Sequence, residues 1–497
     1  MTIGKLLRVG PAAEPAPASL LRIRVTGLEY DSRRVQAGFV FFAFPGAKTD
    51  GRQFAQAAMG RGAVAVVSES EKPVGFEGPW VRVEHGRKTL ALWARAFYGN
   101  PDQNLALTAL TGTNGKTTTV FLVDAMLRAL GRTTGMLGTI EYRVGAERRT
   151  AVNTTPESLD LMRLFREMAD CGTTHCTLEV SSHALELERV YGLEFHTAVF
   201  TNLTRDHLDF HLTMEAYFRA KHRLFEGAGG PPPRWAVINH DDEYGPRIET
   251  AAETHRLSYG FQSGVDLRAT NVRMDFDGLR FDIDHPGGKQ RLESPLVGRI
   301  NVYNLLAAFG AGLSLGLAPE QAAAGLASLD AVPGRFERVD EGQPFLVVVD
   351  YAHTDDALRN TLTVARAMGP KRVLTLFGCG GDRDRAKRPM MGEAAGQLSD
   401  FVIVTSDNPR SEDPLTIIND AMVGVRRTDV RNIVEPDREK AIRKAIEEAG
   451  PGDIVLIAGK GHETYQVLKD QTIAFDDREV VRRILRSYGY RREEGSA

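Results

Sequence analysis

The sequence predicts an α/β protein built from three domains, and three observations lead to this prediction. The chain has 497 residues, which is more than a single hydrophobic core supports. Short apolar runs alternate with helical patterns, as in parallel sheets with crossover helices. Gly and Pro interrupt this alternation near residues 97–101 and 332–334. We therefore expect domains over residues 1–98, 99–332 and 333–497.

The composition is that of an ordinary globular protein, with 42% hydrophobic and 26% charged residues. A net charge of −3 argues against a nucleic-acid partner. No apolar run approaches the length of a membrane span, and Glu14 and two prolines break the apolar stretch at residues 12–18. Cys171, Cys176 and Cys379 are too few for a disulfide framework and lack zinc-site spacing. We expect a cytoplasmic protein without membrane insertion.

The first hundred residues have the pattern of a small α/β domain. An apolar strand is predicted over Phe39–Phe44, and a helical stretch over Phe54–Arg61. A second buried strand is predicted over Ala63–Val67. The Gly-Asn-Pro segment that ends at Pro101 closes the domain, because Gly and Pro together end a helix.

Residues 105–130 have the parts of a phosphate-binding loop. The apolar run Leu105–Leu110 predicts a strand, Thr111–Gly115 form a glycine-bearing turn, and the pattern over Val120–Leu130 predicts a helix. Glycines let backbone N–H groups surround a phosphate, and a helix N-terminus adds partial positive charge. Lys116 can reach the β- and γ-phosphates, and the Thr117 hydroxyl can hold Mg²⁺.

This motif departs from the usual pattern at one position. Leu110 stands where phosphate-binding loops have their first glycine. An ordinary strand-to-helix turn is therefore the alternative interpretation. The strand before the turn and the helix after it favour a nucleotide site.

The remaining strands follow the same alternation. In the central domain they are expected over Cys176–Val180, Thr197–Thr201 and Trp235–Ile238, with a loop over Gly227–Pro233. Residues 265–297 alternate as in an antiparallel appendage, with turns at Asp277-Gly278 and at Pro286 to Gly288, and a helix follows over Asn301–Leu315. In the third domain strands are expected over Phe345–Asp350, Arg372–Phe377, Phe401–Thr405 and Asp453–Ala458. The charged tail Arg491–Ala497 is expected to be frayed.

Polar motifs follow several of these strands, at the sheet edge where α/β proteins bind ligands. Glu179 comes directly after one strand, and Asp206 and His207 follow the next as candidate metal or metal-shell groups. Lys221 lies in a helical stretch, where a lysine is ordinarily a surface residue. Asp350 precedes a predicted helix, where Asp and Thr also serve as N-cap residues.

Two glycine-rich turns, at residues 377–384 and 458–463, also follow strands. Each is either a tight turn or a place where the backbone approaches a ligand, with a charged side chain beside it.

Taken together, these motifs resemble the Mur ligase family, in its UDP-N-acetylmuramoyl-tripeptide type. The resemblance covers the whole chain and runs in one order from Asp31 to Glu463. The matching segments are Tyr30–Arg33, Thr111–Thr118, Asn153–Thr155, Glu179–His183, Asp206–Asp209, Ala220-Lys221, Pro333–Glu337, Asp350–His353, Gly378–Asp384, Asp407–Arg410 and Gly459–Glu463.

The resemblance implies an ATP- and Mg²⁺-dependent ligase that adds a diamino acid to UDP-N-acetylmuramoyl-L-alanyl-D-glutamate. It implies one domain each for the uridine nucleotide, ATP and the amino acid, and we expect a monomer. An acyl phosphate would form first, and the amine would then attack it. Such chemistry between anions needs cations, which Lys116, Mg²⁺ and arginines can supply.

The family's site residues transfer by position. ATP would contact Gly112, Thr113, Asn114, Gly115, Lys116, Thr117, Thr118, Asn304 or Asn301, Arg335 and Asp350. Thr117, Glu179 and His207 would serve Mg²⁺, joined by Lys221, which matches the lysine that is carbamylated in the family. The uridine nucleotide would contact Tyr30, Ser32, Ala47, Lys48 and Thr49, and the muramoyl-dipeptide Asn153, Thr154, Thr155, Ser181 and Arg189. The diamino acid would contact Arg383, Asp407, Asn408, Pro409, Arg410, Gly459 and Glu463.

Two positions depart from the family pattern. Some relatives have Gln where this chain has Leu187, two residues before Arg189, which puts that substrate contact in doubt. Asp355 replaces a proline at a helix start, where either residue is tolerated.

The amino acid is predicted to be meso-diaminopimelate, because the Arg410 guanidinium can bind its second carboxylate bidentately. Lysine-adding relatives usually lack this arginine. The alternatives are the L-lysine-adding ligase of the same family, a folylpolyglutamate-synthetase-like ligase, and a phosphate-loop switch protein without ligase activity. The N-terminal Asp31-Ser-Arg33 segment and the Asp407–Arg410 motif speak against a folylpolyglutamate synthetase.

Overall fold

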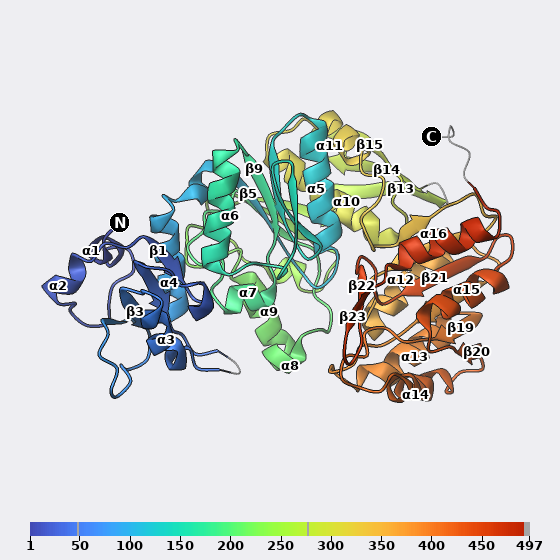
Figure 1. Ribbon diagram of the computed structural model, residues 1–497. Coiled ribbons are helices and arrows are strands. Elements are labelled where there is room, and N and C mark those ends of the chain that lie inside the picture. Colours follow the sequence, from blue (N-terminus) through green and yellow to red (C-terminus); the bar gives the residue numbers. More distant parts are fainter. Residues whose placement is uncertain (47–48, 276–277, 492–497) are drawn as a thin grey trace. The chain divides into compact units, whose positions relative to one another are not determined.

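The structure of the chain is a computed structural model that describes residues 1–46, 49–275 and 278–491 (Figure 1). Two compact units make up the chain. The first comprises Met1–Arg268, His285–Gly287 and Leu305–Leu326, and the second comprises Ala269–Asp284, Gly288–Asn304 and Ala327–Ala497. Both contain parallel sheets with crossover helices, so the predicted α/β class is confirmed. Within the described residues, no helix is both long and apolar enough to cross a bilayer.

The N-terminal part of the first unit contains a parallel four-stranded sheet in the order β1-β2-β3-β4. Its strands are β1 (Gly27–Glu29), β2 (Phe39–Phe42), β3 (Ala65–Ser68) and β4 (Trp80–Arg82). The helices here are α1 (Ile3–Leu6), α2 (Ala18–Leu21), α3 (Ala55–Gly60) and α4 (Gly86–Phe97). The predicted strand at 39–44 ends two residues early, which leaves Phe44 in the loop beyond it.

An eleven-stranded sheet follows, in the order β15-β14-β13-β12-β11-β10-β5-β9-β6-β7-β8. The pairs from β12 to β6 are parallel, whereas β7 and β8 add an antiparallel edge. Its strands in the first unit are β5 (Ala106–Thr111), β6 (Thr134–Leu137), β7 (Glu141–Val144), β8 (Glu147–Thr150), β9 (His175–Glu179), β10 (Thr197–Phe200), β11 (Trp235–Asn239) and β12 (His255–Gly260). The four strands predicted here agree with the structure to within one residue at each end.

The helices beside this sheet are α5 (Lys116–Ala129), α6 (Ser158–Asp170), α7 (Ser182–Glu186), α8 (Leu208–His211), α9 (Met214–His222), α10 (Arg299–Ser314) and α11 (Pro319–Leu326). Helix α5 begins four residues before the predicted start at Val120, because the three threonines belong to its first turn. Thr119 fits there since its hydroxyl donates to the Gly115 carbonyl oxygen at 2.9 Å.

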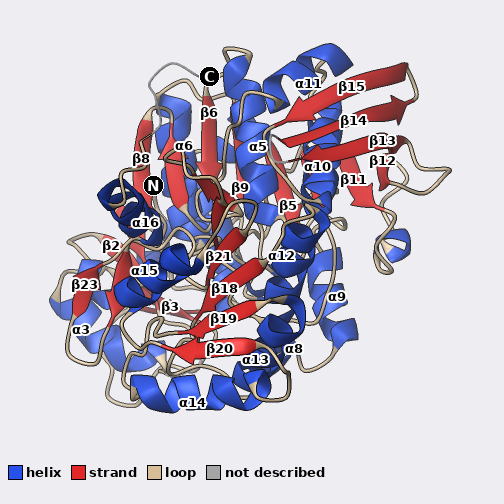
Figure 2. Ribbon diagram, turned by 90° about the vertical axis from the view of Figure 1, so that its right-hand side faces the viewer, coloured by secondary structure: helices blue, strands red, loops and turns tan. Residues whose placement is uncertain are grey.

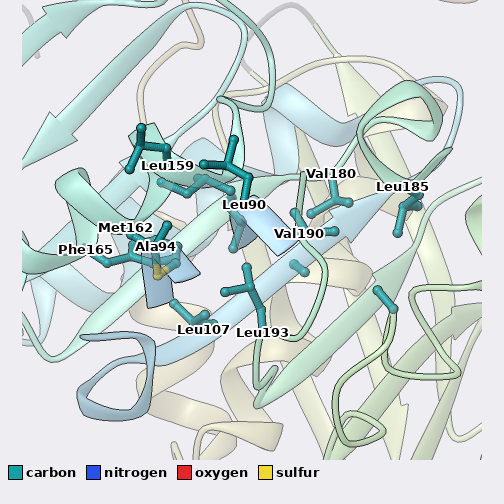
Figure 3. Close-up of a cluster of buried hydrophobic side chains, with 14 of the residues drawn as sticks. Leu90, Ala94, Leu107, Leu159, Met162, Phe165, Val180, Leu185, Val190 and Leu193 are labelled. Carbon is teal, nitrogen blue, oxygen red and sulfur yellow. The ribbon is translucent and has the colours of Figure 1, made fainter. Parts of the chain in front are cut away.

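A shared hydrophobic cluster joins α4 to the central sheet (Figure 3). Leu90 and Ala94 of α4 belong to the same buried cluster as Leu159 and Met162 of α6. All four side chains are no more than 2% exposed. This packing fixes the start of α4 relative to the start of α6, which matters for the site below.

The strands β13 (Leu267–Asp275), β14 (Gly278–His285) and β15 (Gly288–Ser294) are neighbours in the sheet and lie where the appendage was predicted. The predicted Asp277-Gly278 turn lies partly outside the described residues, because Asp277 is not among them. Helix α10 starts two residues before the predicted helix and ends one residue before it.

The C-terminal part has a six-stranded sheet in the order β16-β17-β21-β18-β19-β20. Its strands are β16 (Glu337–Val339), β17 (Leu346–Asp350), β18 (Val373–Phe377), β19 (Phe401–Val404), β20 (Arg431–Val434) and β21 (Ile454–Ala458). Only β16 pairs antiparallel. The helices are α12 (Asp355–Ala367), α13 (Lys387–Leu398), α14 (Pro414–Val425), α15 (Arg438–Glu448) and α16 (Asp477–Ser487), and a separate hairpin is formed by β22 (Tyr465–Val467) and β23 (Thr472–Ala474).

Helices cover both faces of this sheet (Figure 2). Alternate residues of β17 belong to two separate cores: Leu346 and Val348 pack in the α12–α14 core, and Val347 and Val349 in the α15–α16 core. A strand buried on both faces reads as a continuous apolar run, which is why the sequence predicted it.

Candidate active site

The phosphate loop lies between β5 and α5, at the carboxyl end of a central parallel strand. Gly112 has a φ of +147°, and a Cβ atom there would lie 1.9 Å from the Thr201 hydroxyl. Only glycine fits this position, for both conformational and steric reasons. The loop therefore comes close to β10, the neighbouring strand.

The segment after β10 holds this loop in place. The Asn114 N–H donates to Asn202 Oδ1 at 2.9 Å, and the Asn202 side-chain amide and the Thr201 hydroxyl both donate to the Asn114 carbonyl at 3.0 and 2.7 Å. Neither Thr201 nor Asn202 was predicted to be a site residue. Their position directly after a strand beside the loop was the available signal.

Two lysines converge on one backbone carbonyl. Lys116 Nζ donates to the carbonyl oxygens of Gly112 and Thr113 at 2.8 and 2.9 Å, and Lys221 Nζ donates to the same Gly112 oxygen at 2.7 Å. Lys221 is only 2% exposed. Burial, and then the charge of Lys116, hold the Lys221 pKa well below its usual value. Lys221 is thus buried beside the loop and is not the surface lysine that its helix alone suggests.

Glu179 ends β9 with a carboxylate that is 1% exposed. The Thr139 N–H donates to Oε1 at 2.9 Å, and the Thr139 hydroxyl donates to Oε2 at 3.1 Å. Thr139 also lies 3.1 Å from the Thr154 hydroxyl. Thr139, which the sequence analysis did not single out, therefore orients Glu179 and links it to the segment Asn153–Thr155.

The predicted muramoyl-dipeptide residues also come together. The Thr155 hydroxyl donates to the Glu179 carbonyl at 2.9 Å and accepts from the Ser181 N–H at 3.1 Å. Arg189 Nη1 donates to the Thr155 carbonyl at 2.9 Å. Asn153 is tied in through its N–H, which donates to the Tyr142 hydroxyl at 2.9 Å.

His207 precedes α8 in a left-handed backbone conformation, with a φ of +52°. Its ring centroid lies 4.8 Å from that of His183, and its Nε2 lies 3.5 Å from Asp206 Oδ2. Burial lowers the His207 pKa, and the charge of Lys116 lowers it further, against the opposing effect of Asp206. A neutral ring can offer a nitrogen lone pair, as a metal ligand must.

The predicted uridine residues lie in the N-terminal part. The Tyr30 hydroxyl donates to Asp160 Oδ2 at 2.5 Å, and burial raises the pKa of Tyr30. Ser32 begins a short 3₁₀ turn, and the Thr49 carbonyl accepts from the Gly46 N–H at 2.9 Å. Ala47 and Lys48, which share the prediction, lie outside the described residues.

In the second unit, Asn301 and Arg335 line one small pocket, together with Val297 and Phe336. Asn304 lies just behind, and its Nδ2 donates to Asn301 Oδ1 at 2.8 Å. The Asp350 carboxylate accepts from the N–H groups of Phe336 and Ala352 at 2.7 and 2.9 Å. Burial raises the Asp350 pKa, whereas the Arg335 charge lowers it.

The predicted diamino-acid residues form a buried polar cluster around Lys460. Lys460 Nζ donates to Asn408 Oδ1 at 3.2 Å and Glu463 Oε2 at 3.1 Å, and lies 3.7 Å from Asp407 Oδ1. Asn408 Nδ2 also donates to Glu463 Oε2 at 2.7 Å. Gly459, at a φ of +115°, lies against Asp407. Lys460, which is fully buried, was not among the predicted site residues.

Arg410 lies at the edge of this cluster in a left-handed conformation, with a φ of +51°. Arg410 Nη1 donates to the Gly381 carbonyl at 2.7 Å. Pro409 directly precedes Arg410 in the loop. A Cβ atom at Gly380 would lie 3.0 Å from Arg410 Nη1 and 3.8 Å from Arg383 Cγ. Gly380 thus separates two arginines, of which Arg383 is exposed.

Comparison with known proteins assigns the family. The catalytic-domain model of the Mur ligase family matches residues 24–98, the Mur ligase middle-domain model residues 110–312, and the Mur ligase glutamate-ligase-domain model residues 334–461. The chain is also 64% identical over 490 residues to a ligase from Solibacter usitatus, with 99% of both chains covered. The chain therefore belongs to the Mur ligase family, and its α/β fold carries the three domains of that family.

The relatives belong to one kind of Mur ligase. The Solibacter usitatus protein is a UDP-N-acetylmuramoyl-L-alanyl-D-glutamate–2,6-diaminopimelate ligase. A ligase of the same name from Geobacillus kaustophilus is 46% identical over 469 residues, covering 94% of this chain and 96% of the relative.

Solved structures with a similar fold include a ligase of the same name. A structure of a UDP-N-acetylmuramoyl-L-alanyl-D-glutamate–2,6-diaminopimelate ligase has a TM-score of 0.71 and 34% identity, covering 98% of this chain and 100% of its own. Folylpolyglutamate synthase from Mycobacterium tuberculosis shares the fold at a TM-score of 0.59, with 18% identity and coverage of 76% of this chain and 93% of its own.

Proposed function

We propose that this chain adds meso-2,6-diaminopimelate to UDP-N-acetylmuramoyl-L-alanyl-D-glutamate at the expense of ATP, a step of peptidoglycan precursor synthesis in the cytoplasm. The observation that carries this proposal is the convergence of Lys116 and buried Lys221 on the Gly112 carbonyl of the phosphate loop. Relatives that are 46–64% identical over nearly the whole chain bear the name of this ligase. We further propose that it acts as a monomer.

Each domain takes one substrate in this proposal. Residues 1–98 hold the uridine nucleotide, residues 99–332 ATP, and residues 333–497 the amino acid. Tyr30 and Ser32 serve the first site, and the phosphate loop serves the second. Asn301, Arg335 and Asp350 also contact the nucleotide; the pocket that Asn301 and Arg335 share supports this role.

The chemistry requires activation of a carboxylate. A carboxylate oxygen of the D-glutamyl residue attacks the γ-phosphorus of ATP, the bond to the bridging oxygen breaks, and ADP leaves. The amine of diaminopimelate then attacks the acyl carbon, loses a proton and expels inorganic phosphate. Lys116 stabilises the charge on the transferring phosphoryl group.

The residues near the phosphate loop suit Mg²⁺. Mg²⁺ in nucleotide sites takes one or two protein carboxylates and completes its shell with phosphate oxygens and water. Glu179 offers an oriented, buried carboxylate, and Thr117 offers a hydroxyl in the first turn of α5. Burial lowers the pKa of His207, which favours the neutral ring that a metal ligand needs. When bound, the metal would neutralise phosphate charge in transfer.

Lys221 is proposed to be carbamylated. Carbamylation joins an uncharged amine to CO₂ with loss of one proton, so it requires the lowered pKa that burial and Lys116 produce at Lys221. The product has a carboxylate-like group in place of an ammonium. It would relieve the like-charge contact with Lys116 and offer oxygen to Mg²⁺.

The amino-acid site is proposed to lie between the Lys460 cluster and Arg410. Asp407 and Glu463 supply negative charge for an ammonium group, and Arg410 supplies a guanidinium for the distal carboxylate of diaminopimelate. Gly380, Arg383, Asn408 and Gly459 line the same loops.

An assay of ADP release tests the function. The purified chain is mixed with ATP and Mg²⁺, and then with pairs drawn from a panel of acceptors and amino acids. ADP release is expected only with UDP-N-acetylmuramoyl-L-alanyl-D-glutamate and meso-diaminopimelate together. ADP release with folate and glutamate would favour a folylpolyglutamate synthetase. ADP release without formation of an amide would favour a switch ATPase.

A further inference from the structure

Two arginines from different elements share one carboxylate in the first unit. Arg87, the second residue of α4, donates through Nη1 to Glu157 Oε1 and Oε2 at 3.1 and 3.2 Å. Arg189 donates through Nε to Glu157 Oε1 at 3.0 Å. These three side chains carry a net charge of +1. They are only 12–19% exposed, so the charge is only partly screened by water.

The Glu157 carboxylate accepts hydrogen bonds from these arginines and not from the N–H groups of its own helix. It is the N-cap residue of α6, yet its side chain makes no capping hydrogen bond. An N-cap side chain ordinarily accepts from the first helical N–H groups. The packing of Leu90 and Ala94 with Leu159 and Met162 holds the starts of α4 and α6 together (Figure 3). The Arg87–Glu157 contact is therefore built into the fold.

A row of contacts runs from the proposed nucleotide site to the proposed dipeptide site through Arg87. The Tyr30 and Phe44 rings are stacked with centroids 6.4 Å apart, and the Arg87 guanidinium carbon lies 4.4 Å from the Phe44 centroid. Beyond Arg87 come Glu157 and Arg189, whose Nη1 reaches the Thr155 carbonyl at 2.9 Å. Arg34 lies over the Tyr30 ring, with its guanidinium carbon 5.1 Å from the centroid, and Arg87 is the cation on the Phe44 side of the pair.

These contacts do not occupy all the N–H donors of Arg87. Across residues 1–46, 49–275 and 278–491, Arg87 donates hydrogen bonds only through Nη1. Nε and Nη2 keep their N–H groups for another acceptor. A guanidinium is a planar fork of N–H donors, which suits bidentate binding of phosphate oxygens.

We propose that Arg87 binds the diphosphate of the uridine-nucleotide substrate. This inference rests on the proposed function, which puts uridine near Tyr30 and the dipeptide near Thr155 and Arg189. In such a substrate a diphosphate and a sugar lie between the two ends. Arg87 lies between the same two sites and has a cation, an aromatic support and unused donors for the anion.

Binding of three ligands to the purified full-length chain tests the proposal: uridine, UDP and UDP-N-acetylmuramoyl-L-alanyl-D-glutamate, each measured by calorimetry. Arg87→Met is expected to weaken UDP and the full substrate by about 10- to 100-fold and to leave uridine within about 2-fold. Arg87→Lys should fall between, because it keeps the charge and loses the fork. Lys88→Met is the matched control: it removes one positive charge at the next position, and Lys88 faces Glu188 at 3.6 Å.

Glu157→Gln separates a direct role from an indirect one. If Arg87 contacts the diphosphate, Glu157→Gln leaves UDP affinity within about 3-fold of the parent, because the guanidinium itself remains. Equal losses in Arg87→Met and Glu157→Gln would mean that Arg87 acts only through Glu157, and would overturn the proposal. Unchanged UDP affinity in Arg87→Met would overturn it too. Failure of the unmodified chain to bind the full substrate would refute the proposed function instead.

Discussion

At the scale of single residues, the convergence of Lys116 and Lys221 on the Gly112 carbonyl has a chemical consequence. Two ammonium groups beside one oxygen repel each other, and one of them is fully buried. The lowered pKa of Lys221 removes this conflict by favouring its uncharged form. In the proposed function, Lys116 then remains as the cation for phosphate, and Lys221 is the amine that is carbamylated.

Lys116→Ala is predicted to abolish ligation and to leave the fold intact. Loss of the charge on the transferring phosphoryl group should cost several kcal/mol of barrier, or about 10³-fold or more in rate. The measurement is ADP release by the purified variant, with circular dichroism to check folding. Arg128→Ala, which removes an exposed cation from the last turn of α5, is the control. Near-parental turnover by Lys116→Ala would contradict the ATP-site assignment.

Lys221→Ala is predicted to be nearly inactive and to recover partly in added acetate. A small carboxylate can enter the space of the carbamate and offer the same oxygens. Activity is measured with and without acetate, and mass spectrometry of the parent chain should show one added CO₂ at Lys221. Arg219→Ala on the same helix removes an exposed cation and should behave like the parent. Full activity of Lys221→Ala without acetate would rule out the role.

The sequence singled out candidate site residues but not their surroundings. Of the predicted residues, Glu179, Thr155 and Asn408 each lie in a hydrogen-bonded cluster in the structure, and their roles stay predictions. Lys460 and Thr139, which lie in the same clusters, were not predicted. Each has a partner distant in sequence, Asn408 for Lys460 and Glu179 for Thr139, and a single sequence does not show that a lysine after a glycine is fully buried.

At the scale of elements, strands buried on both faces were predicted most accurately. β17, β18, β19 and β21 agree to within one residue at each end, because a continuous apolar run is bounded sharply by polar turns. The antiparallel edge strands β7 and β8 were missed. β8 is mostly exposed, and its sequence, Glu-Arg-Arg-Thr, has no apolar residue to signal a strand.

The junction of β5, the phosphate loop and β10 leads to a prediction about Gly112. Gly112→Ala would force a Cβ atom to 1.9 Å from the Thr201 hydroxyl and a side chain into a φ of +147°. We expect Gly112→Ala to lower the free energy of unfolding by roughly 2–4 kcal/mol. We also expect that ATP binding is no longer detectable. Denaturant unfolding and nucleotide titration measure the two effects.

Gly131→Ala is the control for backbone strain alone. Gly131 also has a positive φ, +72°, but a Cβ atom there would meet no other atom within 4 Å. It should cost about 1 kcal/mol and leave ATP binding unchanged. Equal effects of the two substitutions would show that the approach of the loop to Thr201 is unimportant.

At the scale of the whole molecule, the order of the motifs along the chain indicated the family but not which loops of one sheet lie together. Asp407–Arg410 and Gly459–Glu463 are separated by about fifty residues, yet the parallel order β21-β18-β19 brings the loops after these strands to one sheet edge. That outcome follows from parallel pairing. The side-chain partners across the loops depend on rotamers and burial, which periodicity does not describe.

The predicted specificity for the amino acid depends on the loops at this sheet edge. Diaminopimelate and L-lysine share an amine at an L-centre, but only diaminopimelate has a carboxylate at its far end. Arg410 is held in a left-handed backbone conformation, and its guanidinium donates to the Gly381 carbonyl at 2.7 Å. A carboxylate bound there gains charge-assisted hydrogen bonds worth roughly 1.5–3 kcal/mol each. Lysine would leave the guanidinium without this anion.

We therefore predict that kcat/KM for meso-diaminopimelate exceeds that for L-lysine by about 10³-fold or more. Arg410→Ala should lose most of this preference through kcat/KM for diaminopimelate, while KM for ATP stays near the parental value. Arg427→Ala removes an exposed arginine of the same unit that pairs with Glu393, and should keep the preference. Comparable kcat/KM for the two amino acids in the parent chain would refute the assignment of Arg410. An Arg410→Ala variant that used diaminopimelate as well as the parent would refute it equally, because the cation that distinguishes the two substrates would then lie elsewhere.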